Sequence, residues 1–164
     1  MGVNESRTSV KKYHMHKIDE NIFIGDQYSV QNESELKSHG IKHILQLFDV
    51  PANEKMYNLC IRPLPRGKTF SVIPYLQDCL RFINEAESKG EKVLVHCKWG
   101  KNRSAIVLIA YYMAKKGWTY EHAVEFIKKK RAIDPSLRLK NQLISAGKEL
   151  SSYLTLCEEI TNVA

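Results

Sequence analysis

Residues 93–104 read Val-Leu-Val-His-Cys-Lys-Trp-Gly-Lys-Asn-Arg-Ser, and the elements expected around them decide the fold class. The apolar run Val93–His96 predicts a short buried strand. A short loop containing Gly100 follows it, and the nearly all-apolar run Ser104–Lys116 predicts a central helix that Gly117 would cap. A buried strand joined through a tight loop to a buried helix is typical of an α/β protein.

The remaining sequence predicts further strands that alternate with helices. Asn32 and Glu35 have the spacing of a helix-capping pair, and Gly40 is placed to end that helix. The other expected elements are two short strands within 15–25, strands at 41–48 and 57–61, and helices at 72–88, 120–131 and 137–153. This alternation predicts one α/β domain, spanning 15–155 between a flexible segment 1–14 and a tail 156–164.

The composition of the 164-residue chain fits one soluble globular domain, with 43% hydrophobic and 26% charged residues. The chain has neither an apolar run of the ~20 residues that a membrane span requires nor the apolar core of a secretory signal. The four cysteines are irregularly spaced, so we expect no zinc site, no disulfide framework, and a reducing, cytoplasmic setting. The net charge of +7 favours anionic partners such as phosphoproteins, inositol lipids or RNA, although it serves solubility equally well.

Cys97 directly follows the predicted strand, and a helix is expected to begin a few residues later. A thiol of ordinary pKa is mostly protonated at neutral pH, so a cysteine nucleophile needs a stabilised thiolate. Loop N–H groups and the start of the helix would stabilise a thiolate and would also hold a phosphate. Gly100 permits the backbone conformation that such a tight loop requires. These features predict covalent phosphoryl transfer through a phosphocysteine, with no metal ion or other cofactor.

Three neighbours of Cys97 have roles in this chemistry. Arg103, in the first helical turn, would hold two phosphate oxygens and stabilise the charge of the transferred group. Ser104 would donate a hydrogen bond to the sulfur and make it a better leaving group, while His96 would order the corner between strand and loop. A second Cys-x5-Arg match, 60–66, contains two prolines, no glycine and no helix directly after it, so we interpret it as chance.

The segment 93–104 resembles the HCxxGxxRS loop of the cysteine-dependent protein tyrosine phosphatase superfamily, in its small dual-specificity branch. Residues 22–25 resemble an early strand of that branch, 40–45 resemble its GITHVL strand, and 131–143 resemble its R-x-x-I-x-P…QL stretch. The resemblance implies a central, largely parallel sheet of about five strands flanked by helices, with the site at the carboxyl ends of the strands. It also implies a protein phosphatase acting on phosphotyrosine, phosphoserine or phosphothreonine.

The chain differs from the branch at the general acid, which in the branch is an aspartate in a loop well before the cysteine. Arg66 occupies that position, and residues 62–70 contain no carboxylate. An acid in this role contributes typically ~10²–10⁴-fold to the rate. Three explanations remain open. Asp49 or Asp134 could substitute; the substrate could have a leaving group that needs no proton, such as a phosphoanhydride; or the domain could turn over slowly and mainly bind phosphorylated partners.

The loop side chains bear on the substrate, and the expected phosphate-binding residues are Lys98, Trp99, Gly100, Lys101, Asn102 and Arg103. The two lysines resemble the HCKxGKxR loop of phosphoinositide 3-phosphatases, and the Asn-Arg pair resembles the GxNR of cysteine-type RNA triphosphatases. Both substrate classes are therefore alternatives to a phosphoprotein, with RNA less favoured because no aromatic-rich RNA-binding motif is visible. Trp99 would either stack on a ring of the substrate or pack against a neighbouring loop, and packing is preferred.

The N-terminal Met-Gly-Val-Asn-Glu-Ser fits the pattern for myristoylation of Gly2, and Arg7, Lys11 and Lys12 would add an electrostatic membrane signal. Chance produces the same pattern about as readily. The sequence thus predicts a monomeric, cytoplasmic phosphatase, with peripheral membrane contact if Gly2 is acylated. The alternative to an enzyme is a module that binds phosphorylated partners with little turnover.

Overall fold

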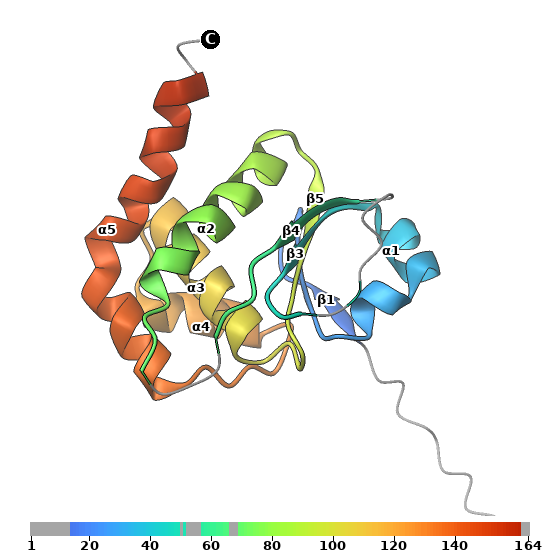
Figure 1. Ribbon diagram of the computed structural model, residues 1–164, viewed down its shortest axis with the longest axis horizontal. Helices are drawn as coiled ribbons and strands as arrows, with labels where there is room; N and C mark the ends of the chain where they lie inside the picture. Colours follow the sequence, from blue (N-terminus) through green and yellow to red (C-terminus); the bar gives the residue numbers. More distant parts are fainter. Residues whose placement is uncertain (1–13, 50, 52–56, 66–68, 162–164) are drawn as a thin grey trace, which may run out of the picture.

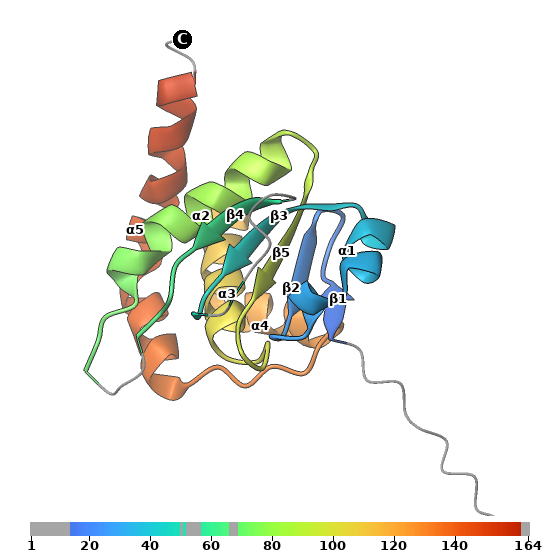
Figure 2. The same ribbon diagram turned by 45° about the vertical axis from the view of Figure 1, so that its right-hand side comes forward.

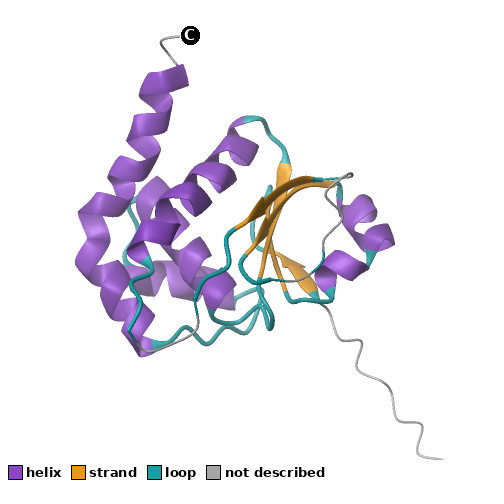
Figure 3. Ribbon diagram, viewed as in Figure 1, coloured by secondary structure: helices purple, strands orange, loops and turns teal. Residues whose placement is uncertain are grey.

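The computed structural model describes residues 14–49, 51, 57–65 and 69–161, with the backbone alone for 156–161. These residues form a five-stranded sheet of order β1-β2-β5-β3-β4 between layers of helices (Figure 1, Figure 3). The strands are β1 (Met15–Lys17), β2 (Ile22–Gly25), β3 (Ile41–Gln46), β4 (Asn58–Ile61) and β5 (Lys92–His96). Among these strands β1 alone runs antiparallel to its neighbour. The predicted α/β fold with a largely parallel sheet of about five strands is confirmed.

Helices cover both faces of the sheet, and most of them lie on one face. They are α1 (Glu33–His39), α2 (Ile73–Ser88), α3 (Arg103–Lys116), α4 (Tyr120–Lys128) and α5 (Leu137–Thr161), with a short 3-10 helix η1 (Ser29–Gln31) before α1. Figure 1 shows α1 on one side of the sheet and α2 to α5 on the other. In β5, Val93 and Val95 join the large apolar cluster with α2 to α5, whereas Leu94 joins the smaller cluster with α1. Since successive residues of a strand point to opposite faces, β5 is buried on both.

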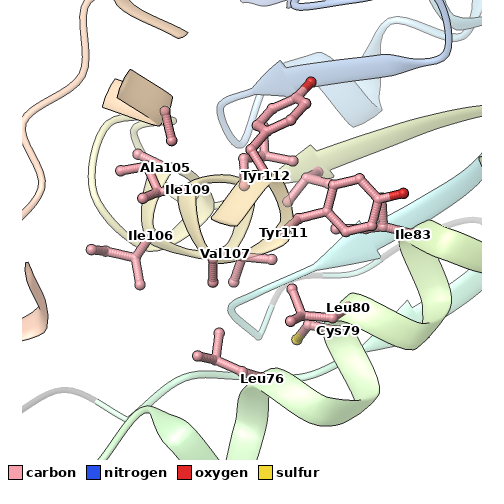
Figure 4. Packing of buried hydrophobic residues seen from close by; sticks show 14 of the residues in the cluster. Leu76, Cys79, Leu80, Ile83, Ala105, Ile106, Val107, Ile109, Tyr111 and Tyr112 are labelled. Atoms are coloured by element: carbon pink, nitrogen blue, oxygen red, sulfur yellow. The ribbon is translucent and has the colours of Figure 1, made fainter. Parts of the chain in front are cut away.

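Helix α3 lies in the centre of the large cluster because it is apolar on every side. Every residue from Ser104 to Met113 is buried. Figure 4 shows the side chains of α2 and α3 that meet there, among them Leu76, Leu80 and Ile83 from α2 and Ile106, Val107 and Tyr111 from α3. Gly117, with φ 66°, ends the helix as predicted, and its N–H donates to the Met113 carbonyl at 3.1 Å. The loop attached to the first residue of α3 is therefore fixed by a helix that cannot move independently of the core.

The carboxyl ends of β2, β3 and β5 meet at one edge of the sheet (Figure 2). In the strand register His96 pairs with Gly25 on one side and with Gln46 on the other. Segments that follow these three strands therefore lie next to one another. Cys97 begins the segment that follows β5.

Three element boundaries differ from those expected. β3 ends at Gln46 instead of continuing through 48, and α4 ends at Lys128, which leaves Arg131 in the connection to α5. Helix α5 continues to Thr161, beyond the expected domain boundary at 155, because 154–161 contain no glycine or proline that would end it. The expected flexible segment 1–14 lies outside the described residues apart from its last residue. Every helix within the described part of the chain is too short or too polar to cross a membrane.

Candidate active site

Residues 97–102 form the Cys97 loop, which connects β5 to α3 at the carboxyl edge of the sheet. The Cys97 N–H donates to the last carbonyl of β2 at 3.3 Å, and the Gln27 N–H donates back to the loop at 3.1 Å. On the other side, the Asp134 N–H donates to the Lys101 carbonyl at 2.8 Å. Backbone hydrogen bonds thus tie the loop both to the segment after β2 and to the segment before α5.

The Cys97 sulfur is buried and held by two hydrogen-bonding groups. Ser104 Oγ lies 3.2 Å from Cys97 Sγ, and the Gly100 N–H donates to Sγ at 3.2 Å. Burial alone would raise the pKa of this thiol. The hydrogen bonds and the positive charge of Arg103 outweigh burial, so the pKa of Cys97 lies below that of an ordinary thiol. The site therefore favours a thiolate.

Gly100 is required both by its conformation and by its surroundings. Its φ of 64° lies in the left-handed region, which residues with side chains adopt only at a cost. A β-carbon at this position would lie 2.6 Å from Arg131 Nη2 and 2.7 Å from the Gly25 carbonyl oxygen. Because Gly25 ends β2, a paired strand, a larger residue at position 100 would displace the loop instead.

Arg131 supports the Cys97 loop by donating hydrogen bonds to two backbone carbonyls of the loop. Nε donates to the Gly100 carbonyl at 2.9 Å, and Nη2 donates to the Trp99 carbonyl at 3.2 Å. Nη1 lies 2.9 Å from His16 Nδ1 in β1, so the same guanidinium ties the loop to the edge strand. In the sequence Arg131 ends a run of lysines at an expected helix end, yet in the structure its side chain is buried and only 9% exposed. Its place at the head of the R-x-x-I-x-P stretch was the one signal that set it apart from the lysines.

Asp26 is a buried carboxylate beside Arg131 that sequence reasoning missed. Its Oδ2 lies 2.8 Å from His14 Nδ1 and 4.0 Å from Arg131 Nη2. Its Oδ1 accepts a hydrogen bond from the Tyr28 N–H at 2.9 Å. The carboxylate is thus held in place and balances the buried guanidinium. An aspartate after a strand equally suits an ordinary turn, so its pattern could not have revealed this position.

Arg103, the first residue of α3, extends toward the segment that follows β3. Its Nη1 donates to the Leu47 carbonyl at 3.4 Å, and its guanidinium carbon lies 5.6 Å from the centre of the Phe48 ring. Arg103 lines the same cavity as Cys97. A planar guanidinium at this place can hold two oxygens of a phosphate whose phosphorus faces the sulfur.

His96 is fully buried behind the loop. Its Nε2 lies 3.2 Å from Gln46 Oε1, an acceptor, so the ring carries its proton on that nitrogen. Nδ1 is buried without a hydrogen-bond partner among the described residues, and the ring meets Phe48 edge-on at 5.6 Å. Burial lowers the pKa of His96 to about 4, which makes it a neutral residue at the strand-to-loop corner.

A cavity of about 1080 Å³ opens at the Cys97 loop. Among the residues that line it are seven of the predicted site, namely Cys97, Lys98, Trp99, Lys101, Asn102, Arg103 and the candidate acid Asp134. Asn102 also anchors the next segment, since its Oδ1 accepts from the Ser136 N–H at 3.0 Å. His96 and Ser104 are buried behind this lining.

Trp99 projects from the rim of the cavity. Its side chain is 58% exposed, so the preferred interpretation, packing against a neighbouring loop, is wrong. The Lys98 ammonium lies 5.3 Å from the centre of its ring. An indole in this position offers an apolar face to whatever enters the cavity.

The two candidate acids are placed differently. Asp134 is exposed and lines the cavity, whereas Asp49 is exposed but is not part of the lining. Arg66 lies outside the described residues, although the preceding Pro65 lines the cavity. Gly2 also lies outside the described part of the chain.

The second Cys-x5-Arg match is not a site. Cys60 is half-buried in β4, and burial raises the pKa of its thiol. Arg62, within that match, pairs with Asp78 at 2.7 Å. Cys60 thus lies in a strand and not in a loop that could surround its sulfur, which agrees with the interpretation of this match as chance.

The chain is similar in sequence to known proteins. Residues 22–149 match the family described as "Dual specificity phosphatase, catalytic domain". Protein phosphatase Slingshot of Drosophila melanogaster is 37% identical over 133 residues, which are 77% of this chain and 12% of that protein. Dual specificity protein phosphatase 22 of Xenopus tropicalis is 33% identical over 137 residues, or 82% of this chain and 65% of that protein.

The solved structures give the same result for the fold. The crystal structure of DUSP15 has a TM-score of 0.82 at 22% identity, covering 88% of this chain and 95% of that chain. The family match spans most of the chain, including all of the Cys97 loop. The chain belongs to the dual-specificity branch of the cysteine-dependent protein tyrosine phosphatases.

Proposed function

We propose that the chain is a protein phosphatase that hydrolyses phosphotyrosine, phosphoserine or phosphothreonine through a phosphocysteine intermediate. The observation that carries this proposal is the environment of Cys97, whose sulfur is 3.2 Å from both Ser104 Oγ and the Gly100 nitrogen. A lowered thiol pKa and a guanidinium in the same cavity complete the requirements for attack on a phosphate ester.

In the first step the Cys97 thiolate attacks phosphorus, and the bond from phosphorus to the ester oxygen breaks. The departing oxygen takes a proton from a general acid, and phosphate remains bonded to sulfur. Arg103 and the loop N–H groups stabilise the charge on the equatorial oxygens. In the second step water attacks phosphorus, the S–P bond breaks, and the Ser104 hydroxyl donates a hydrogen bond to the departing thiolate.

Asp134 is our candidate for the general acid. It lines the cavity, and its backbone N–H is tied to the Cys97 loop at 2.8 Å from the Lys101 carbonyl. Asp49 is a weaker candidate because it does not line the cavity. Arg66 cannot serve, since a guanidinium remains protonated at any working pH.

A phosphoinositide is the second candidate substrate. Lys98 and Lys101 both line the cavity and would suit a substrate with several phosphates. A protein of the same fold, PTPMT1, has been crystallised in complex with PI(5)P, with a TM-score of 0.72 and 20% identity to this chain. At that identity the likeness concerns the fold alone. An RNA 5′-triphosphatase and a phospho-binding module with weak turnover are further alternatives.

We also propose a monomeric protein in the cytoplasm, with membrane contact through an acylated Gly2. The support is the N-terminal sequence together with Arg7, Lys11 and Lys12. Expression in a eukaryotic cell should place part of the protein in the membrane fraction, and Gly2→Ala should return that part to the cytosol. If the two proteins distribute identically between membrane and cytosol, Gly2 does not anchor the protein to membranes.

The function is tested by hydrolysis of a panel containing an aryl phosphate, phosphopeptides, phosphoinositides and triphosphate-ended RNA. Cys97→Ser should abolish turnover, because serine supplies no comparable anion at neutral pH. The matched control is Cys60→Ser, which removes the half-buried thiol of β4 and should leave turnover nearly unchanged. Turnover by the Cys97→Ser protein at more than a few per cent of the wild-type rate would remove Cys97 from the mechanism.

A further inference from the structure

Three segments that are far apart in the sequence meet at the Arg131 side chain, which lines the catalytic cavity. Its Nε donates to the Gly100 carbonyl at 2.9 Å, and its Nη1 donates to the His14 carbonyl at 3.3 Å. Arg131 itself follows α4, which ends at Lys128. The first residue that the structure describes, the Cys97 loop and the end of α4 therefore lie together at one edge of the molecule.

Five lysines lie around this junction, and we call them the basic rim. They are Lys98 and Lys101 in the Cys97 loop and the three lysines at 128–130. Lys98 and Lys101 line the cavity, and 128–130 directly precede Arg131. Lys98 is half-buried, and the other four are exposed.

The positive charge of the basic rim is not neutralised within the described part of the chain. No lysine of the basic rim forms an ion pair with any of the described carboxylates. The exposed carboxylates within 125–134 are Glu125 and Asp134, whereas Asp26 is buried and lies 4.0 Å from Arg131. The basic rim is therefore a local excess of positive charge beside the cavity.

Trp99 stands between Lys98 and Lys101 in the sequence and projects from the rim of the cavity. Its side chain is 58% exposed, and the Lys98 ammonium lies 5.3 Å from the centre of its ring. The indole combines an apolar body with one N–H donor, which suits the boundary between lipid headgroups and acyl chains. Surfaces that bind membranes peripherally combine cations with exposed aromatic side chains in this way.

The chemistry of the basic rim favours a diffuse anionic surface over one discrete anion. All of its cations are lysines, which act as point charges, whereas planar recognition of a single phosphate or carboxylate favours the fork of arginine. Each lysine near an anionic bilayer contributes to the attraction without a partner of fixed geometry. The sequence before residue 14, which lies at the same junction, adds Arg7, Lys11 and Lys12.

We propose that the basic rim and Trp99 form a docking surface for an anionic membrane, with the lysines at the lipid headgroups and the indole between them. In this orientation the catalytic cavity opens onto the membrane, so the phosphorylated residues within its reach belong to proteins at that surface. The docking surface is part of the folded domain and acts without an acyl group on Gly2. It goes beyond the proposed hydrolysis, which requires the cavity alone.

The test measures binding of the purified full chain, without an acyl group, to vesicles. One set contains phosphatidylcholine alone, and the other contains phosphatidylcholine with phosphatidylserine. The chain should bind the second set, and added salt should weaken the binding because it screens the attraction. The triple variant Lys128→Gln, Lys129→Gln and Lys130→Gln should bind about 10²-fold more weakly, given the contribution of each lysine near an anionic surface.

The matched control is the triple variant Lys37→Gln, Lys116→Gln and Lys148→Gln, which removes the same charge from exposed positions outside the basic rim. Lys116 ends α3, whose 14 residues place it about 20 Å from the end that joins the Cys97 loop. The control should keep most of the binding of the unmodified chain.

Tryptophan fluorescence reports on Trp99 itself. The chain has two tryptophans, and Trp118 follows the far end of α3, where its ring is stacked on that of His122 with centres 4.3 Å apart. Lipids brominated in their acyl chains quench a tryptophan that reaches them, so fluorescence should fall when the unmodified chain binds. Trp99→Phe should remove most of this quenching.

Several results would overturn the docking surface. Equal binding to the two sets of vesicles is one, and equal weakening by the two triple variants is another, because net charge alone would then explain the binding. Unchanged quenching in Trp99→Phe is a third. Binding to an acidic peptide but to neither set of vesicles would reject the membrane in favour of a protein partner.

Inorganic phosphate separates the docking surface from the cavity. Vesicle binding should persist in saturating phosphate at constant ionic strength, and its loss would mean that a lipid headgroup occupies the cavity instead. None of these outcomes bears on hydrolysis of an aryl phosphate, whose absence in the unmodified chain would reject the proposed function alone.

Discussion

Replacing Arg131 with methionine should damage both the stability of the domain and the shape of the Cys97 loop. Methionine has a similar length but cannot donate to the carbonyls of Trp99 and Gly100, which accept from Arg131 at 3.2 and 2.9 Å. The change also leaves the Asp26 carboxylate buried without the guanidinium that lies 4.0 Å from it. Asp26 keeps its contact with His14, so the main loss is that of two hydrogen bonds from a charged donor, at about 1.5–3 kcal/mol each or roughly 3–6 kcal/mol together.

That loss is a large part of the roughly 5–15 kcal/mol by which a domain of this size is stable. Urea unfolding should therefore show a clearly lower midpoint for Arg131→Met, with Arg131→Lys in between because it keeps the charge but has donors on one nitrogen only. Arg81→Met is the matched control, since Arg81 is exposed on α2 and its loss should change the free energy of unfolding by no more than about 0.5 kcal/mol.

The effect on the loop can be separated from the effect on stability by working where the variant is still folded. A loop displaced by about 1 Å can lower kcat roughly 10²-fold, and it would also weaken the hydrogen bond from Gly100 to the Cys97 sulfur. The rate of Cys97 alkylation should then reach half its maximum at a higher pH in Arg131→Met than in the wild type. An unchanged urea midpoint together with an unchanged alkylation profile would refute the role given to Arg131.

Further predictions concern the thiol, the buried imidazole and the acid. Ser104→Ala should move the alkylation profile of Cys97 to higher pH, because the hydroxyl is one of the groups that lower the pKa of this thiol; an unmoved profile would contradict that assignment. The pKa of His96 is about 4 in the folded state, below its unfolded value of 6.5, so the unfolded state binds its proton first as the pH falls. Between pH 6.5 and 4 the wild type should lose about 3 kcal/mol more unfolding free energy than His96→Gln, and parallel profiles in chemical denaturation would disprove this. Asp134→Asn should lower turnover of alkyl phosphates ~10²-fold or more and of activated aryl phosphates much less, whereas equal losses across a leaving-group series would exclude it as the acid.

The fold and the centre of the site could be predicted from the sequence because both depend on patterns among residues that are close together in the chain. The apolar strand at 93–96, the apolar helix at 104–116, and the glycines at 100 and 117 each constrain a few neighbouring residues. A strand, a loop and a helix in direct succession also place Cys97 next to Ser104 without any knowledge of the distant chain. The element limits at α4 and α5 were less accurate, since helix ends depend on tertiary contacts that the pattern does not contain.

Two of the groups that sequence reasoning missed, Arg131 and Arg138, act over long distances in the chain. Arg131 reaches the Gly100 carbonyl across 31 residues, and Arg138 reaches Phe70 across 68 residues. Nothing in the lysine-rich run before Arg131 indicates that its side chain turns inward. The exposure of Trp99 was misjudged for a similar reason, because only the assembled rim shows which neighbours a loop side chain has.

The burial of α3 on every side has a consequence for how activity is lost. Protein segments that open locally do so where few apolar contacts hold them. The two elements that carry the Cys97 loop, β5 and α3, are both packed in the middle of the domain. Slow-exchanging backbone amides should therefore extend through α3 up to the turn that bears Arg103, and heat should inactivate the protein and unfold it in a single event. A compound that works by trapping a locally melted catalytic loop would find almost no such state to bind, so selective inhibitors are better directed at the rim around Trp99 and Arg138.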